Sequence, residues 1–134
     1  MVRADFDRSL EELQGDLVGL GEMVEKAILK SMDALERRDL TVAYEVITED
    51  EEINEKRFEL EEKCIDLIAT QQPLAVDLRT LLAVLHIAVE LERMGDYAEG
   101  IGKICMIIGD DEEALAPLQL PQMAEKGIAM LRGS

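Results

Sequence analysis

The stretch LEEKCIDLIATQQPLAVDLRTLLAVLHIAV, residues 60–89, decides the fold because it contains a helix end, a turn and a helix start. The residue before a proline is pushed out of helical geometry, so Gln72-Pro73 predicts the end of one helix. Proline is tolerated in the first turn of a helix, and the next helix is expected to begin at about Leu74. A connection this short makes the two helices antiparallel neighbours.

Working outward from this turn, the spacing of apolar residues predicts three long helices, over 6–38, 40–71 and 74–108. Asp39 is a suitable N-cap for the second of them. Steps of three and four residues define one stripe on each of the first two helices: Phe6, Leu10, Leu13, Leu17, Leu20, Val24 and Ala27 on the first, and Ala43, Val46, Asp50, Ile53, Arg57, Leu60, Cys64 and Leu67 on the second.

The third helix has a stripe of the same spacing, which we expect to face the bundle. It consists of Leu78, Leu82, Leu85, Val89, Glu92, Asp96 and Glu99. After a turn at Gly109, Pro121 opens the beginning of a fourth helix. The predicted fold is therefore all-α, an antiparallel up-down three-helix bundle over residues 1–110, followed at 111–134 by a linker and the start of a further helix.

The charge of the chain excludes several classes of partner. Asp and Glu number 30 against 14 Lys and Arg, a net charge of −16, which repels phosphate backbones and anionic lipid. Nucleic acid and membrane are not expected partners, and the longest apolar run, residues 81–89, is too short to span a bilayer. The N-terminus lacks the apolar core of a secretory signal. Cys64 and Cys105 lie in apolar patterns and are expected to be buried thiols, which indicates a cytoplasmic protein.

The helical stripes are interrupted by polar residues at one height of the predicted bundle. Asp50 and Asn54 on the second helix are as far from the turn as Asp96 and Glu92 on the third, so an antiparallel hairpin brings the two pairs together. Buried carboxylates need a counter-charge, a proton or a cation. A salt-bridge network with Arg57 or Arg93, a proton-sharing pair, and a cation held by oxygen ligands all remain possible.

Catalytic and cofactor motifs are missing from the sequence. His86, the single histidine, is interpreted as a core residue, and there is no Glu-x-x-His pair for a di-iron site. There is no glycine-rich phosphate loop and no serine beside a base. We therefore expect neither enzymatic activity nor an organic cofactor.

Residues 43–103 resemble the PhoU family of phosphate-uptake regulators, and the resemblance extends to about 6–108. The landmarks, in order, are Asp50 with Ile53, Cys64, Gln71-Gln72-Pro73-Leu74-Ala75, Asp77-Leu78-Arg79, and Glu92-Arg93-Met94-Gly95-Asp96. The resemblance implies one three-helix repeat of a protein that usually contains two.

The resemblance also implies a function. PhoU proteins are cytoplasmic negative regulators of phosphate uptake and phosphate-starvation signalling. They contact a phosphate sensor histidine kinase and the ATP-binding subunit of a phosphate ABC transporter, and they usually self-associate. Since a single repeat leaves an apolar side uncovered, we expect a homodimer.

Some family members bind iron, zinc or other divalent or trivalent cations through Glu/Asp-x-x-x-Asp motifs on the second and third helices. By position, the metal ligands would be Asp50, Asn54, Glu92 and Asp96. Asn54 stands where an acid is usual, which argues against a multinuclear cluster. The alternative functions are a helical bundle whose main role is to bind metal, and a structural bundle whose carboxylates are only salt-bridged.

Overall fold

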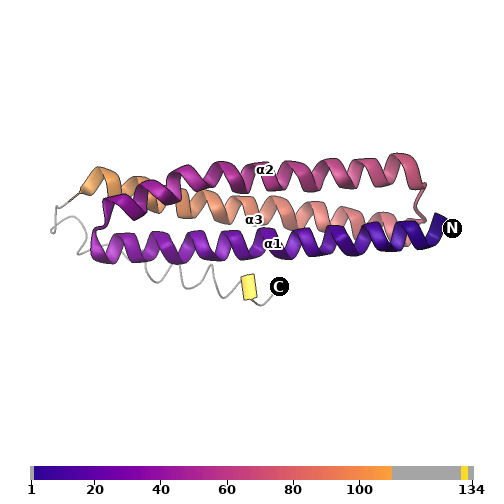
Figure 1. The fold of residues 1–134 in the computed structure, drawn as a ribbon, viewed down its shortest axis with the longest axis horizontal. Coiled ribbons are helices and arrows are strands. Elements are labelled where there is room, and N and C mark those ends of the chain that lie inside the picture. The colour runs from indigo at the N-terminus through magenta and orange to yellow at the C-terminus, as the bar shows by residue number, and fades with distance from the viewer. Residues whose placement is uncertain (1, 110–130, 133–134) are drawn as a thin grey trace.

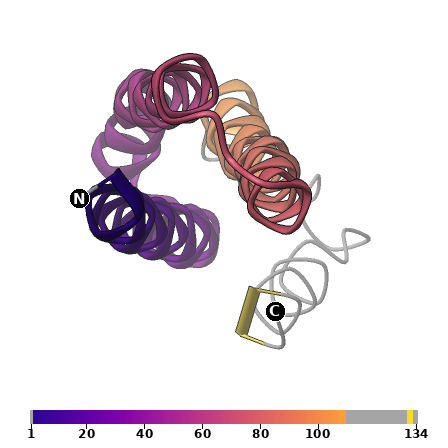
Figure 2. The ribbon, with the colours of Figure 1, turned by 90° about the vertical axis from the view of Figure 1, so that its right-hand side faces the viewer.

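In the computed structural model, three long helices form one antiparallel bundle (Figure 1). Helix α1 spans Val2–Arg37, α2 spans Leu40–Gln71 and α3 spans Ala75–Ile108. The structure describes residues 2–109 and 131–132, and these contain no strand. Seen from one end, the three helices stand at the corners of a triangle (Figure 2). The predicted three-helix, up-down all-α fold is confirmed.

The helix boundaries follow from the chemistry predicted at the two connections. The Asp39 carboxylate accepts hydrogen bonds from the backbone N–H groups of Thr41 and Val42, at 3.1 and 3.2 Å, and so caps α2. At the other end of α2, Gln72 adopts a left-handed conformation with φ 46°. Pro73 follows it and cannot continue the helical hydrogen bonding, so the chain turns into α3.

The predicted stripes of α1 and α2 form most of the core. On α2, all the stripe residues are buried except Arg57, which is half-buried. On α1, five of the seven are buried and the other two pack partly buried against the core: Phe6, Leu13, Leu20, Val24 and Ala27, with Leu10 and Leu17. Hydrophobic residues are 48% of the chain and aromatic residues only 3%, so this core is aliphatic.

The stripe predicted for α3 is wrong. Leu78, Leu82, Val89 and Asp96 are exposed, and the buried face is rotated around the helix axis from the predicted one. Helix α3 carries apolar residues on more than one side, so more than one stripe satisfies the helical period. The stripe that is buried contains more small residues and therefore allows closer packing; it comprises Leu81, Val84, Ala88, Leu91, Gly95, Ala98, Ile101, Gly102 and Cys105.

Two glycines on α3 show how closely it approaches α2. A Cβ added at Gly102 would lie 3.1 Å from the Ala43 carbonyl oxygen and 3.3 Å from Ile47 Cγ1. A Cβ at Gly95 would lie 3.4 Å from the Ile53 side chain. The absence of side chains at these positions is what brings the two helices together.

The single histidine also departs from the prediction. His86 is exposed on α3 and is not a core residue. Because the buried stripe is rotated, position 86 lies on the outer side of the helix.

Both cysteines are buried free thiols, as predicted. Burial, with a smaller contribution from the negative charge of Glu61, raises the pKa of Cys64 to about 11. Burial likewise raises the pKa of Cys105. Both thiols therefore remain protonated at neutral pH and behave as small apolar side chains.

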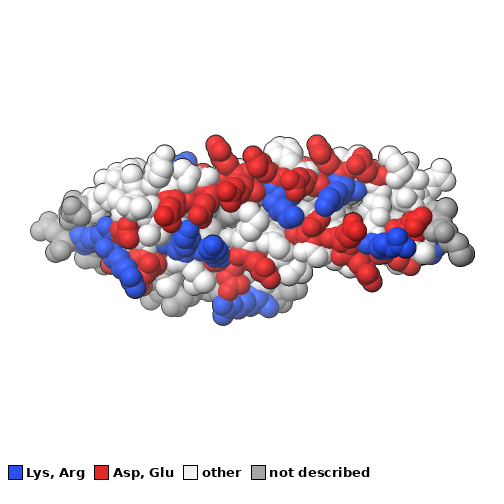
Figure 3. Space-filling model, viewed as in Figure 1, with Lys and Arg blue, Asp and Glu red and all other residues white. Residues whose placement is uncertain are grey.

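Acidic side chains cover much of α1 and α2 on the face shown in Figure 3, with basic side chains between them. Lys30 of α1 pairs with Glu45 at 3.2 Å and Glu49 at 2.9 Å on α2. Asp16 of α1 pairs with two lysines of α2, Lys56 at 3.4 Å and Lys63 at 2.5 Å. These cross-helix pairs place three lysines, Lys30, Lys56 and Lys63, at the contact between α1 and α2.

Beyond α3, residues 131–132 are helical and lie against the bundle. Leu131 packs partly buried against the core, and Arg132 pairs with Glu25 of α1 at 2.5 Å. The predicted boundary at residue 110, the linker and the helix start at Pro121 lie outside the described residues. Within the part of the chain that is described, no helix is both long enough and apolar enough to cross a membrane.

Candidate functional site

The polar residues that were predicted to interrupt the apolar stripes of the second and third helices surround Asp50 of α2. Its side chain is only 5% exposed, and its Oδ1 atom has no hydrogen-bond partner. Gly95 of α3 faces it, and a Cβ there would lie 3.6 Å from that oxygen. Asp50 therefore lies in the α2–α3 contact with α3 backbone against it.

The surroundings of Asp50 favour its protonated form. Burial is the largest cause, followed by the adjacent Glu99 carboxyl group and by the negative charges of Asp96 and Glu92, and together they raise the pKa of Asp50 to about 7. A protonated Asp50 can donate a hydrogen bond to a neighbouring carboxylate. The raised pKa of Asp50 therefore favours the proton-sharing arrangement, one of the three left open by the sequence.

Glu92 is neutralised in a different way. Arg57 of α2 forms ion pairs with both Glu92 of α3 and Glu61 of its own helix. The guanidinium also lies over the Phe58 ring, 4.5 Å from its centroid. The salt-bridge arrangement predicted with Arg57 is thus present at the same polar site as Asp50. Arg93, the other predicted counter-charge, pairs instead with Glu90 of its own helix at 3.1 Å.

The four predicted ligand positions lie in one region but in different environments. The charges of Glu92 and Asp96 both act on Asp50, which shows their proximity. The Asn54 side chain is half-buried, and its Oδ1 has no hydrogen-bond partner, whereas Asp96 is exposed to solvent.

The prediction of site residues missed Glu99, the carboxylate that helps to raise the pKa of Asp50 and that pairs with Lys103 at 3.0 Å. Its position seven residues after Glu92, on the same side of α3, is the sequence signal that identifies it.

The fit of a metal ion to these residues is limited by Arg57. Among residues 2–109 and 131–132, no group of three or more His, Cys, Asp and Glu side chains is arranged to hold a metal ion. Asp50 and Asn54 offer two oxygens without partners, but Glu92 is paired with Arg57. As the side chains stand they do not fit a metal ion, because a cation would have to displace the guanidinium. Metal binding at Asp50, Asn54, Glu92 and Asp96 stays a prediction.

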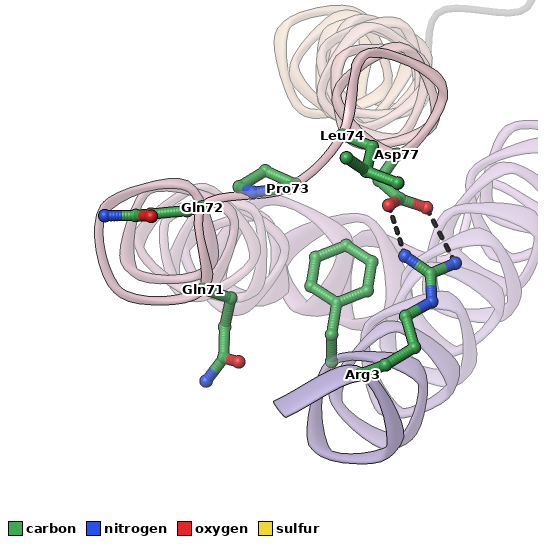
Figure 4. Close-up of a pocket in the computed structure, with 7 residues that line it drawn as sticks. Arg3, Gln71, Gln72, Pro73, Leu74 and Asp77 are labelled. Atoms are coloured by element: carbon green, nitrogen blue, oxygen red, sulfur yellow. Dashed lines mark hydrogen bonds and ion pairs between the residues drawn. The ribbon is translucent and has the colours of Figure 1, made fainter. Parts of the chain in front are cut away.

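A pocket of about 230 Å³ lies at the end of the bundle that holds the α2–α3 connection (Figure 4). The Arg3 guanidinium donates to the Asp77 carboxylate across it and holds the pKa of that carboxyl below its usual value. Since this pair neutralises itself, the pocket presents no free charge to a ligand. Its lining is Arg3, Phe6, Gln71, Gln72, Pro73, Leu74 and Asp77.

Comparison with known proteins adds to this geometry. The family model described as the PhoU domain matches residues 17–105. A "Phosphate-specific transport system accessory protein PhoU homolog" from Clostridium acetobutylicum is 36% identical over 135 residues, covering 100% of this chain and 62% of the relative. A homolog of the same description from Streptococcus pneumoniae is 35% identical and covers 97% of this chain and 60% of the relative.

Solved structures of PhoU proteins have the same fold as this chain. The phosphate transport system regulatory protein PhoU from Streptococcus pneumoniae superimposes with a TM-score of 0.84 at 34% identity, over 95% of this chain and 59% of that one. PhoU from Pseudomonas aeruginosa gives a TM-score of 0.81 at 28% identity, over 95% and 60%. The chain spans about three fifths of the length of the relatives it matches. In sequence and in fold, this chain belongs to the PhoU family.

Proposed function

We propose that this protein is a cytoplasmic, non-catalytic negative regulator of phosphate uptake and of phosphate-starvation signalling. The observation that supports this most directly is the PhoU-domain match over residues 17–105. The relatives that share it are described as accessory proteins of a phosphate-specific transport system. A regulator of this kind acts by binding other proteins, for which a rigid bundle with a charged surface is suited.

The partners we propose are a phosphate sensor histidine kinase and the ATP-binding subunit of a phosphate ABC transporter. A net charge of −16 favours partners that present basic surfaces, and it increases the rate at which they associate. The carboxylates along α1 and α2 supply such a surface (Figure 3). We expect both interactions to weaken as salt is added.

The test is a pulldown combined with a genetic measurement. The purified chain is incubated with the purified ATP-binding subunit and, separately, with the cytoplasmic part of the sensor kinase. Deletion of the gene in its own bacterium is expected to raise a phosphate-starvation reporter in phosphate-rich medium, and re-expression is expected to lower it. Failure to retain either partner, together with an unchanged reporter, would show that the proposal is wrong.

A second candidate function is metal binding, favoured by the buried, unpartnered oxygens of Asp50 and Asn54. The ion would be iron, zinc or another divalent or trivalent cation, because the donors are oxygens. Bound metal and melting temperature are compared for the wild type and Glu92→Ala/Asp96→Ala after addition of iron, zinc, manganese or magnesium. Metal-dependent stabilisation of the wild type alone supports the site. No bound metal and no shift for any ion leaves only the salt bridge of Glu92 and the raised pKa of Asp50.

A further inference from the structure

Helix α3 has a second apolar stripe, which lies on the outside of the bundle. Leu78, Leu82 and Val89 are 36%, 53% and 38% exposed, and Leu85 between them is partly buried. Their spacing of four, three and four residues aligns them on one side of the helix, as in the seam of a coiled coil. The core of this chain does not use the stripe, because a different face of α3 packs against α1 and α2.

A row of basic side chains borders this outward stripe. Arg79, His86 and Arg93 recur at seven-residue intervals, so they lie along one line of α3, and all three are exposed. The segment between Asp77 and Glu90 contains no acidic residue, although acids outnumber basic residues by more than two to one in the chain. In coiled-coil terms, the basic row occupies the flanking position that selects the charge of a partner helix.

We propose that this outward face of α3 docks an amphipathic helix of a partner protein whose apolar stripe is bordered by acidic side chains. The apolar residues of the partner would cover Leu82 and its neighbours. Its carboxylates would lie against Arg79 and would replace Glu90 at Arg93, whose solvent-exposed pair with Glu90 is weak. The face from residue 78 to residue 93 is about 24 Å long, which matches a helix of about four turns. The proposal goes beyond the proposed function, because the acidic surface of α1 and α2 would bind basic partners.

The charges on and near the outward face of α3 argue against two other binding partners for it, a second copy of the chain and an anionic membrane. A second copy of this chain, packed antiparallel on the same stripe, would bring the two basic rows together and repel. An anionic membrane is disfavoured because α2, beside α3, presents many carboxylates along its length (Figures 2 and 3). A helix with an acidic border satisfies both the apolar stripe and the basic row.

The experiment uses two labelled helical peptides of about 20 residues. Both have leucines at the spacing of the stripe; one has glutamates along its edge, and the other has lysines at the same positions. Binding to the full chain is measured by fluorescence anisotropy at about 0.15 M salt, where the long-range attraction of the acidic protein for lysine is screened. We expect the glutamate peptide to bind at least about tenfold more tightly than the lysine peptide.

Substitutions at exposed positions make the test specific. Leu82→Glu is expected to abolish binding, and Tyr44→Glu, at a comparably exposed position on α2, is expected to leave it unchanged. Arg79→Glu/Arg93→Glu is expected to reverse the preference of the chain in favour of the lysine peptide. Circular dichroism of each variant checks that the bundle is intact.

Three results would overturn the proposal. The first is no binding of either peptide up to about 1 mM. The second is tighter binding of the lysine peptide to the wild type. The third is a wild-type dimer that Leu82→Glu converts to a monomer in light scattering, which would assign the stripe to a second copy of the chain.

Discussion

At Asp50, a carboxyl group lies inside the contact between two helices, and its protonation depends on its neighbours. Its ordinary pKa of 3.8 is raised to about 7 by burial and by the carboxylates of α3. Burial of a carboxylate is unfavourable unless it is neutralised, and a proton on Asp50 supplies part of what the Arg57 cation supplies to Glu92. Two acids on one side of the bundle are thus stabilised by two different means.

The raised pKa predicts how stability depends on pH. The native state holds the Asp50 proton more tightly than the unfolded state does, so the contribution of this residue is greatest below pH 4 and is lost as pH rises through about 7. Asp50→Asn, which does not ionise, is therefore expected to be more stable than the wild type at pH 8, by on the order of 1–3 kcal/mol, with a smaller difference at pH 5.

Urea unfolding of both proteins at the two pH values measures this difference. Asp66→Asn, at an exposed position of the same helix, serves as the matched control and is expected to change little. An Asp50→Asn protein that is no more stable than the wild type at pH 8 would contradict the role assigned to the carboxyl.

At the scale of elements, the α2–α3 contact depends on a missing side chain. Adding a Cβ at Gly102 places it 3.1 Å from the Ala43 carbonyl oxygen, a backbone atom that moves only if the helix moves. Gly102→Ala is expected to destabilise the bundle by about 1–3 kcal/mol, despite the higher helix propensity of alanine. Chemical denaturation measures the loss.

Gly15 of α1 provides the matched control. An added Cβ meets no described atom within 4 Å there, so Gly15→Ala is expected to stabilise the protein by about 0.5–1 kcal/mol. If the two substitutions change stability in the same direction, close helix approach does not explain Gly102.

The N-cap of α2, Asp39, is a second feature of the helices that affects stability. Asp39→Ala removes the acceptor for two backbone N–H groups and is expected to lower the free energy of unfolding by about 1 kcal/mol. Asp39→Ser keeps an acceptor at the N-cap and is expected to retain most of that stability. Thermal melts followed by circular dichroism compare the variants, and equal melting temperatures for Ala and wild type would exclude a capping role.

At the scale of the whole molecule, α1 has an exposed apolar line away from the core. Val18 and Leu29 are exposed on the same side of the helix as Glu25, which pairs with Arg132. We predict that this side mediates self-association. Light scattering is expected to give a mass of about 30 kDa, twice the chain mass of 15.0 kDa.

Substitutions separate this surface from the outward stripe of α3. Val18→Glu/Leu29→Glu is expected to give a species of the chain mass, whereas Leu82→Glu is expected to leave the dimer intact. A wild-type protein that stays at the mass of one chain at micromolar concentration and above would show that it does not self-associate.

The sequence by itself determined the two connections between the helices and which faces of α1 and α2 are buried, although α1 begins at Val2 and not at the predicted residue 6. The Asp39 cap and Gln72-Pro73 are local signals whose effect does not depend on tertiary contacts. The stripes of α1 and α2 were also readable, because polar residues on the other side of each helix leave one apolar face. The family landmarks then identified the repeat.

Only the tertiary structure decided which face of α3 is buried. Since α3 has apolar residues on two sides, its period alone does not distinguish Leu81, Val84 and Ala88 from Leu78, Leu82 and Val89. The buried face of α3 is the one that α1 and α2 can approach most closely. Small side chains on that face allow this close approach.

The pairing of the polar residues was likewise beyond the sequence. That Arg57 pairs with Glu92, and that Glu99 lies close enough to Asp50 to raise its pKa, follows from the register and rotation of two helices. The sequence placed these groups at one height of the bundle but left their partners open, because ion pairs and shared protons depend on distances of a few ångströms. Tertiary packing sets those distances.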